Sequence, residues 1–488
     1  MANHKTLQDN RKALSAGIWY TVSNLLIRGV NLITIPIFSR ILSKPELGEF
    51  NNYVAIMTLV TILTTFDLYT SINRARFDYK ENLDEYLSSI TVLSTVITGF
   101  FYLLCMLFSG TAQSLFNMNM TTIHVMFLYM LTSPAIQILQ AKHRIQMKYV
   151  SFIFISILTI VGNALLSLGL ITVMSDRYLG RLIGSALPTV VFGVVIYFIL
   201  LLRGKTLYKK EYWKYALSLS LPLMPHMVSV TILSQFSRIM VMDVQGAEAA
   251  AEFTMICNIA LILVMLWNSF NNAWQPWSME RMNQREYGPL RKASRAYMAL
   301  FFVLVGGLIA IGPEVLYVMG PKSYQGAKYL IPFILLGPAL QLTANLYINV
   351  EIFKKKTLFA SIATIVAACV NIVLNIFFLG RFGLIAAGIN TLIGYIALLL
   401  LHFAFSRRME KERLYDEKFM FIGLGVLMAF SAVMAGLYTM PLIRFPLLVL
   451  ALIVVVLFMR NDIKTIFRIF IRKGHSVGND QAKLSGDE

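Results

Sequence analysis

Residues 87–141 read LSSITVLSTVITGFFYLLCMLFSGTAQSLFNMNMTTIHVMFLYMLTSPAIQILQA and contain no Lys, Arg, Asp or Glu. A helix needs about 20 apolar residues to cross a bilayer, so this stretch has room for two spans and a polar turn. Of the 488 residues, 57% are hydrophobic and 14% charged, against about a quarter charged in soluble domains. The composition predicts an all-α polytopic membrane protein. It excludes a water-soluble enzyme, a disordered chain and a nucleic-acid-binding protein, despite a net charge of +18.

Apolar runs separated by charged or Gly/Pro-containing breaks continue along nearly the whole chain. They predict about fourteen spans, at 13–38, 49–72, 88–109, 122–140, 150–174, 181–202, 215–241, 253–277, 295–319, 329–351, 358–379, 384–405, 419–439 and 445–459. The connections are short, and none is long enough to fold as a domain. We interpret the first run as a retained span, because no small-residue cleavage site follows it.

Most of the 43 lysines and arginines lie in one alternating set of loops. That set contains KHRIQMK, RGKTLYKK, RMNQREYGPLRK, KKK and RRMEKER, and it includes both termini. Positive residues concentrate in cytoplasmic loops, so both termini are predicted to face the cytoplasm. The excess positive charge is thus explained by topology and by contact with anionic membrane lipids. No nucleic-acid partner is expected.

Cys105, Cys257 and Cys369 each lie within an apolar run, where cysteine behaves as a small packing residue. The six histidines are scattered, without the spacing of a metal-binding motif. We therefore expect neither a disulfide framework, nor a metal site, nor a cofactor.

Two segments of similar pattern suggest an internal repeat. SRILSKPELGEFNNY begins at Ser39, and SRIMVMDVQGAEAAAEF begins at Ser237. Each follows a span with proline and crosses a short loop with glycine, which predicts two six-span units in the same orientation. Coincidence among apolar helices is the alternative. The predicted organisation is a cytoplasmic N-terminus at 1–12, a bundle at 13–202, a basic linker at 203–214, a second bundle at 215–405, two additional helices at 406–459 and a basic cytoplasmic tail at 460–488.

Three stretches carry a resemblance to a known family: GIWYTVSNLLIRGVNLITIPIFSRILSKPELGEFNNY, SLSLPLMPHMVSVTILSQFSRIMV and GPEVLYVMGPKSYQGAKYLIP. Together the chain resembles the Wzx-type polysaccharide flippases over about residues 13–405. These belong to the multidrug/oligosaccharidyl-lipid/polysaccharide superfamily, with the MATE drug exporters and the lipid II flippases. The resemblance implies a bacterial inner-membrane protein that moves polyprenyl-pyrophosphate-linked oligosaccharides outward. It also implies, as partners, a polysaccharide polymerase and a chain-length regulator.

Arg28 is the sharpest single feature of the sequence. It lies in the middle of the first predicted span, with Asn24 and Asn31 on the same helical face. Charged residues at that depth usually face a pathway, and the planar guanidinium suits a pyrophosphate. We expect these three residues to bind the headgroup. The alternative is an arginine that holds helices together.

Arg238 and Gln235 share a face of the seventh span and are further pyrophosphate candidates. Because Arg238 lies near the outer end, snorkelling to the interface is the alternative. Arg40, its counterpart in the repeat, and Glu314, at the outer end of the ninth span, are candidate gate residues.

The eighth span carries a polar stripe. Its amides Asn268, Asn271, Asn272 and Gln275 fall on one face, and Trp274 is among them. Amides hydrogen-bond sugar hydroxyls and indoles stack on pyranose rings, so we expect a sugar-contacting cavity wall. Interfacial tryptophans and interhelical amide bonds are the alternatives.

His226, beside Pro225, and Asp67 are candidates for ion coupling. For Asp67 the more ordinary expectation is a local ion pair with Arg74 or Arg76, which are also candidate entry residues for a pyrophosphate. Glu351 directly precedes Lys354, and a local ion pair is the expectation there too.

These residues favour a flippase for lipid-linked oligosaccharides, working by alternating access for surface polysaccharide biosynthesis. The alternatives are a lipid II flippase, which shares the headgroup chemistry, and a cation-coupled drug exporter of the MATE kind, which requires acidic cavity residues. An enzyme is not expected, because no loop carries the paired acids or metal ligands that membrane-embedded catalysis uses.

Overall fold

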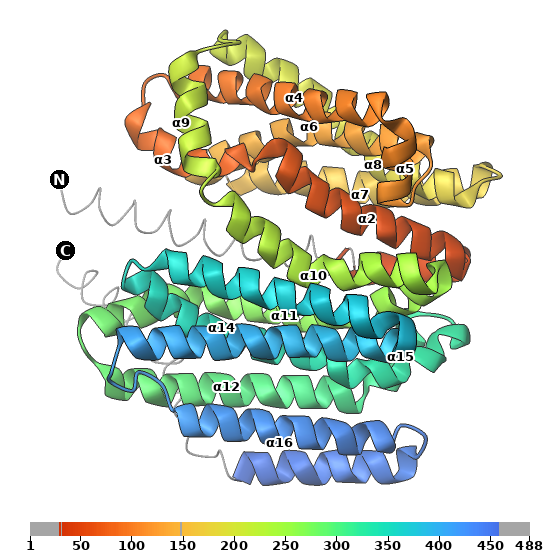
Figure 1. Cartoon of the computed structure of the whole chain (residues 1–488), viewed down its shortest axis with the longest axis vertical. Coiled ribbons are helices and arrows are strands. Elements are labelled where there is room, and N and C mark those ends of the chain that lie inside the picture. Colours follow the sequence, from red (N-terminus) through yellow and green to blue (C-terminus); the bar gives the residue numbers. More distant parts are fainter. Residues whose placement is uncertain (1–28, 31, 147–148, 458–488) are drawn as a thin grey trace, which may run out of the picture. The chain divides into compact units, whose positions relative to one another are not determined.

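The computed structural model describes residues 29–30, 32–146 and 149–457, and every regular element in these ranges is helical (Figure 1). After a short apolar helix at Leu32–Ile41, the helices are α2 Lys44–Thr65, η1 Leu68–Ser71, α3 Ile72–Asp78, α4 Leu83–Leu107, α5 Ser109–Phe116, α6 Met120–Ile145, α7 Tyr149–Val173, α8 Arg177–Gly204, α9 Lys210–Ser220, α10 Met224–Gln245, α11 Ala247–Asn283, α12 Tyr287–Ala310, α13 Gly312–Met319, η2 Lys322–Leu330, α14 Ile331–Phe353, α15 Thr357–Met409 and α16 Glu417–Gly436. A last apolar helix covers Pro441–Leu457.

Ten described helices are long and apolar enough to cross a membrane, or eleven if a bent pair forms one span. The two predicted spans 358–379 and 384–405 both fall within α15, whose backbone leaves the helical region at Gly383 (φ 62°, ψ −150°). The first predicted span lies mostly outside the described residues, and Pro441–Leu457 is apolar but shorter than a full span. The all-α membrane fold is confirmed, and the count of fourteen stays a prediction.

Large apolar side chains cover the outside of the helices. Phe100 and Phe198 are each 57% exposed, and Leu442 is 90% exposed. A soluble protein rarely exposes so much contiguous apolar surface, whereas lipid tails solvate it well. The exposed surface therefore supports a multi-pass membrane protein independently of hydropathy.

Two of the predicted spans are broken helices. Between α2 and η1, Phe66 and Asp67 both adopt left-handed backbone conformations, with φ of 51° and 46°, and the helix axis bends by 54°. The seventh predicted span is divided into α9 and α10 by a turn over residues 221–223. Pro225 falls in the first turn of α10, where its missing N–H has no intrahelical partner to lose.

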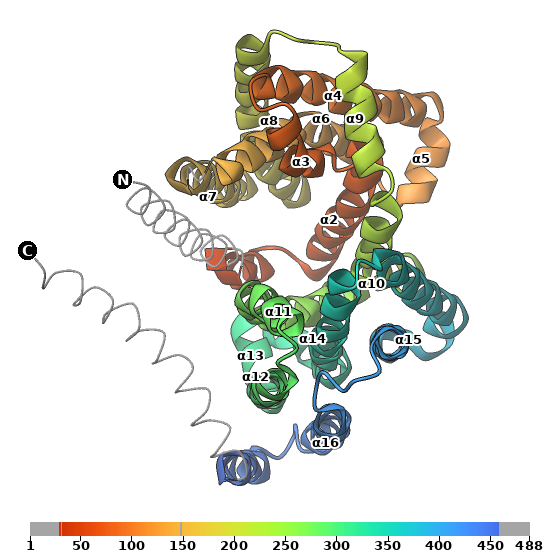
Figure 2. The same ribbon diagram turned by 90° about the vertical axis from the view of Figure 1, so that its left-hand side faces the viewer.

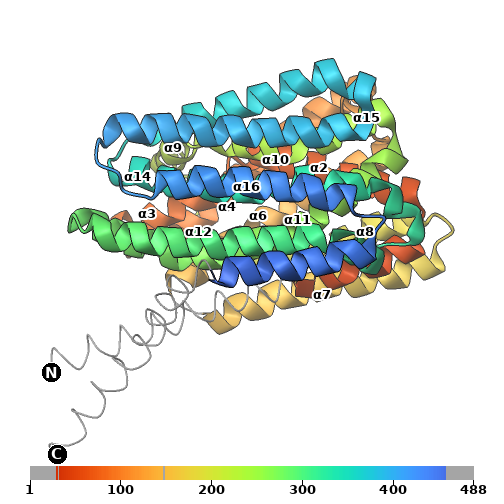
Figure 3. The same ribbon diagram turned by 90° about the horizontal axis from the view of Figure 1, so that it is seen from below.

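Contacts divide the chain into two units, 1–255 with 319–321 and 371–387, and 256–318 with 322–370 and 388–488. In the first, α4, α6 and α8 pack together, with α9 against α4 (Figure 2). In the second, α12 packs against α14 and α16 (Figure 3). These are contact groupings, and the predicted division into six-span bundles stays a prediction.

Candidate functional site

The predicted headgroup residues Asn24, Arg28 and Asn31 lie outside the described residues. The described candidate residues lie on the helices that carry the segments beginning at Ser39 and Ser237 and in the chain that follows each segment.

The two repeat segments contact each other within the first unit. α2 follows the first Ser-Arg-Ile and packs against α10, which carries the second. A Cβ atom placed on Gly48 would lie 1.9 Å from the carbonyl oxygen of Ala247, at the start of α11. Only glycine permits this approach, so backbone touches backbone here. The contact brings the two segments together, and their origin in an internal repeat stays a prediction.

Side chains reinforce this contact on both sides of Gly48. Lys44 forms an ion pair with Glu252, and both side chains are about four-fifths buried. Asn117 Nδ2 donates to Asp243 Oδ1 at 3.1 Å. Ser39 Oγ donates to the carbonyl oxygen of Met319 at 2.8 Å. We call these residues, with Gly48 and Ala247, the hairpin contact. In the predicted topology it lies at the outer end.

Of the two gate candidates, Arg40 is exposed to solvent, whereas Glu314 forms an ion pair. Arg40 Nη1 donates to the carbonyl oxygen of Pro36, one turn earlier in its own helix, at 2.8 Å. In the second unit, Glu314 pairs with Arg444, whose side chain is 1% exposed. This ion pair joins α13 to the start of the Pro441–Leu457 helix. Glu314 thus has a structural role, and its role as a gate residue stays a prediction.

Arg238 and Gln235 are half-buried on α10. Arg238 Nε and Gln235 Oε1 are buried atoms without a hydrogen-bond partner among the described residues. An arginine whose only role was to join helices would use these atoms in hydrogen bonds to neighbouring helices. By contrast, Ser237 between them is fully engaged, since Asn375 Nδ2 donates to its Oγ at 3.1 Å. On α10, therefore, Ser237 joins two helices, whereas Arg238 and Gln235 retain polar atoms without a hydrogen-bond partner in the described part of the chain.

The amide face of α11 lies in the second unit. Among the described residues, no hydrogen bond reaches the side chains of Asn268, Asn271, Asn272 or Gln275, which are half-buried to exposed. Interhelical amide bonding is thus not observed there. Trp274 differs: it is 7% exposed and stacks on Tyr297, with ring centroids 5.1 Å apart and planes 6° apart. Its ring face is occupied by the protein.

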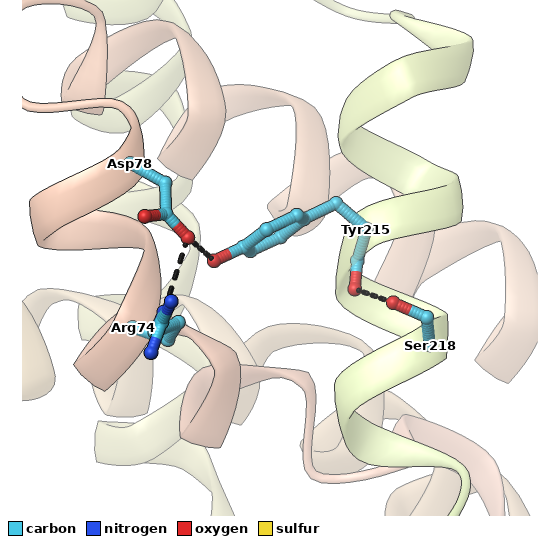
Figure 4. A network of polar contacts seen from close by, with 4 residues as sticks. All are labelled: Arg74, Asp78, Tyr215 and Ser218. Atoms are coloured by element: carbon cyan, nitrogen blue, oxygen red, sulfur yellow. Dashed lines mark hydrogen bonds and ion pairs between the residues drawn. The ribbon is translucent and has the colours of Figure 1, made fainter.

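At the predicted cytoplasmic end of the first unit, α3 is joined to α9. Asp78 Oδ2 accepts from Tyr215 Oη at 2.5 Å and from Arg74 Nε at 3.2 Å, and Ser218 Oγ donates to the carbonyl oxygen of Tyr215 (Figure 4). Tyr79 packs edge-on against Tyr215 at 5.1 Å. Burial and the hydrogen bond to Glu211 raise the pKa of Tyr79 to about 12, so it stays a neutral donor. We call this group the α3–α9 latch.

The local ion pairs expected from sequence are wrong at both positions. Arg74 pairs with Asp78 and Arg76 lies over the Phe77 ring at 4.4 Å, while Asp67, at the helix break, has no ion pair among the described residues. Glu351 pairs with His402, because Lys354 turns to Glu410 instead. His226 is half-buried in the first turn of α10, directly after the second break.

Sequence reasoning missed Arg181 and His402. Arg181, on α8, lies between the rings of Phe38 and Phe50, with its Cζ atom 3.6 and 4.4 Å from their centroids. It anchors the first repeat segment through cation–π contacts. The only sequence signal for His402 was a histidine inside an apolar run, which also describes an ordinary core residue.

The model of a family described as polysaccharide biosynthesis protein matches residues 13–282. The Lsg locus putative protein 1 of Haemophilus influenzae is 22% identical over 350 residues, covering 69% of this chain and 84% of that protein. Among solved structures, the lipid II flippase MurJ in an inward closed conformation has a TM-score of 0.64 at 16% identity, covering 91% of this chain and 100% of that chain. An inward-facing multidrug resistance MATE transporter has a TM-score of 0.59 at 16% identity, covering 80% and 98%.

The structural likeness establishes a fold shared with flippases and multidrug transporters, and the family match covers more than half of the chain. This multi-pass membrane protein belongs to the polysaccharide biosynthesis protein family.

Proposed function

We propose that this protein moves polyprenyl-pyrophosphate-linked oligosaccharide repeat units from the cytoplasmic to the outer leaflet of the bacterial inner membrane. The observation that carries the proposal is the family match, over a chain whose fold follows a lipid II flippase along the whole of that flippase's length. The unpartnered polar atoms of Arg238 and Gln235 support it, because they suit an anionic, hydroxyl-rich cargo.

The proposed cycle depends on the closing and opening of the hairpin contact. In the described state the hairpin contact is closed, which leaves loading from the predicted cytoplasmic side. There the loops are basic and attract a pyrophosphate. Opening of the hairpin contact then releases the headgroup outward, while the polyprenyl tail stays in lipid.

The membrane potential supplies direction in this scheme. Moving one charge across 100 mV changes its free energy by about 2.3 kcal/mol, so two negative charges leaving across about 150 mV gain about 7 kcal/mol. No nucleotide-binding loop of the form GxxxxGK[ST] occurs in the sequence. A carrier driven by gradients fits these facts.

The test is depletion of the protein in cells, followed by extraction of polyprenyl-linked glycans and assignment of the leaflet that holds them. We expect a complete lipid-linked repeat unit to accumulate on the cytoplasmic side. Accumulation of lipid II instead would favour the lipid II flippase. An unchanged lipid pool together with sensitivity to cationic dyes would overturn the proposal in favour of a drug exporter.

The role of the arginines is tested in the same assay. Arg28→Ala and Arg238→Ala should each abolish or strongly reduce export while the protein still inserts and folds. Arg238→Lys should recover only part of the activity, because an ammonium lacks the planar two-donor fork. Normal export by both alanine variants would remove these residues from the site.

A further inference from the structure

A buried acid and a buried histidine meet in the second unit. Glu351 lies in the last turn of α14, and His402 lies near the end of α15. Glu351 Oε1 and His402 Nδ1 are 2.9 Å apart, and both side chains are 0% exposed. Acidic residues are almost never fully buried unless they are paired, so the two residues form one unit.

The remaining polar atoms of the pair are unsatisfied. Glu351 Oε2 and His402 Nε2 are buried and have no hydrogen-bond partner among the described residues. The same holds for the hydroxyl of Tyr347, one turn before Glu351 on the same face of α14. Most buried polar side-chain atoms in proteins are partnered. Unpartnered buried atoms on both members of the pair indicate a site with capacity to bind, rather than a finished structural clamp.

Several charged side chains of the elements that neighbour the pair form ion pairs with one another. Tyr415, in the connection between α15 and α16, packs edge-on against Tyr347 with ring centroids 5.7 Å apart. Its hydroxyl group donates a hydrogen bond to the carbonyl oxygen of Leu346. The charged side chains of the neighbouring elements form their own ion pairs, namely Lys354 with Glu410, Arg407 with Glu417, and Arg295 of α12 with Asp416. Among the described residues, no charged side chain other than these two forms an ion pair with either member of the pair.

Three charge states follow from simple counting. With one shared proton the pair is net neutral, either as carboxylate and imidazolium or as carboxylic acid and imidazole. Loss of that proton leaves a net charge of −1, and gain of another leaves +1. A buried net charge is strongly unfavourable without compensation.

We propose that Glu351 and His402 form a proton-binding site that couples the transport cycle to the proton gradient. Uptake of one proton converts the carboxylate and neutral imidazole into the net-neutral pair, and only an N–H or O–H bond forms. The neutral pair holds the ends of α14 and α15 together. Loss of the proton favours their separation, which admits water to the carboxylate. The coupling rests on the proposed function, whereas proton binding itself does not.

Proton binding is tested on the purified full chain, without any substrate. Thermal unfolding midpoints are measured from pH 5.5 to 8.5 for the wild type and Glu351→Gln. The matched control is Glu410→Gln, which removes a carboxylate from a more exposed pair on the same helix ends. We expect the wild-type midpoint to fall as pH rises, because the singly charged pair is left buried. Glu351→Gln should flatten this dependence, and Glu410→Gln should keep it.

A second variant covers the case in which Glu351→Gln does not fold. Replacing both partners by apolar residues often costs little, since no polar atom is then stranded. The double variant Glu351→Leu/His402→Leu should fold and show the same flat pH dependence. A wild-type pH dependence in either folded variant overturns the proton site.

Coupling is tested in cells by collapsing the pH gradient with an electroneutral K⁺/H⁺ exchanger that leaves the potential in place. Wild-type export should fall at least threefold, and export by Glu351→Gln should no longer respond. A wild-type response in that variant overturns the coupling. If depletion of the protein leaves lipid-linked glycans unchanged, the proposed function fails, while the unfolding experiment still decides the proton site.

Discussion

The hairpin contact and the α3–α9 latch join the same two stretches of chain by different means. The hairpin contact has backbone against backbone at Gly48 and the carbonyl oxygen of Ala247, with side-chain pairs around it. The latch is made by side chains, with tyrosine rings and the shared carboxylate of Asp78. Backbone contacts tolerate no added atom, whereas side-chain contacts can weaken by degrees. The turn at 221–223 separates the two, so we infer that α10 moves when the hairpin contact opens, while α9 stays with α3.

The largest effect should come from Gly48. Gly48→Leu cannot form the hairpin contact, because even its Cβ atom overlaps Ala247. We expect loss of export and a protein that stays open at the predicted outer end. Labelling of a cysteine placed at Lys44 by a membrane-impermeant maleimide measures this opening. Gly110→Leu is the control, since nothing lies within 4 Å of its added Cβ atom. Unchanged labelling in Gly48→Leu would show that the contact is not a gate.

Reversing one charge in the hairpin contact should have the next largest effect. Glu252→Lys places two like charges together in a site that is about four-fifths buried. We expect export to fall roughly tenfold, which corresponds to about 1.4 kcal/mol. The double reversal Lys44→Glu/Glu252→Lys should restore most of it, because the pair is rebuilt. Failure of the double reversal would mean that one residue acts apart from the pair.

Within the latch, Tyr215→Phe removes the hydrogen bond to Asp78 and keeps the ring contacts. Because the accepting carboxylate of Asp78 is exposed to solvent, loss of this hydrogen bond should destabilise the protein only modestly. We expect a lower thermal unfolding midpoint with export largely retained. The control is Tyr208→Phe, whose side chain is exposed at 62%. If Tyr215→Phe reduced export as severely as Gly48→Leu, the α3–α9 latch and the hairpin contact would not differ in their importance for transport.

The smallest effect should come from Arg74→Ala. Arg74 and Asp78 form an i, i+4 ion pair whose side chains are 70% and 38% exposed. Exposed pairs of this kind contribute very little to stability, because solvent screens them. We expect no measurable change in unfolding at physiological salt. A marked loss of export without loss of stability would instead support the predicted role of Arg74 in pyrophosphate entry.

The sequence was informative where physical constraints are local and repeated. Hydropathy places most spans, because every membrane helix must be apolar over a similar length. The repeat at Ser39 and Ser237 stays a prediction, and the packing of α2 against α10 was not part of it. The break at Phe66 and Asp67 could not be predicted, since neither glycine nor proline marks it.

Pairs between distant residues were equally inaccessible to sequence reasoning. Glu351 sits beside a run of lysines in the chain, yet the helix directs it toward His402 on another helix. The charged residues adjacent to Glu351 in the sequence therefore did not predict its ion-pair partner in the structure. For the amide face of α11, the sequence gives the spacing of the amides, whereas the stacking of Trp274 on Tyr297 depends on tertiary packing.

The backbone turn at Gly383 has a practical consequence for topology mapping. Two predicted spans meet there without an intervening loop, and φ of 62° is a value that residues with a side chain rarely adopt. A reporter enzyme or epitope tag inserted between 380 and 386 has no loop to lengthen and would distort both helices. Fusions at this position should report misfolding rather than sidedness, so glycosylation or protease scanning of these two spans needs the loops at their far ends.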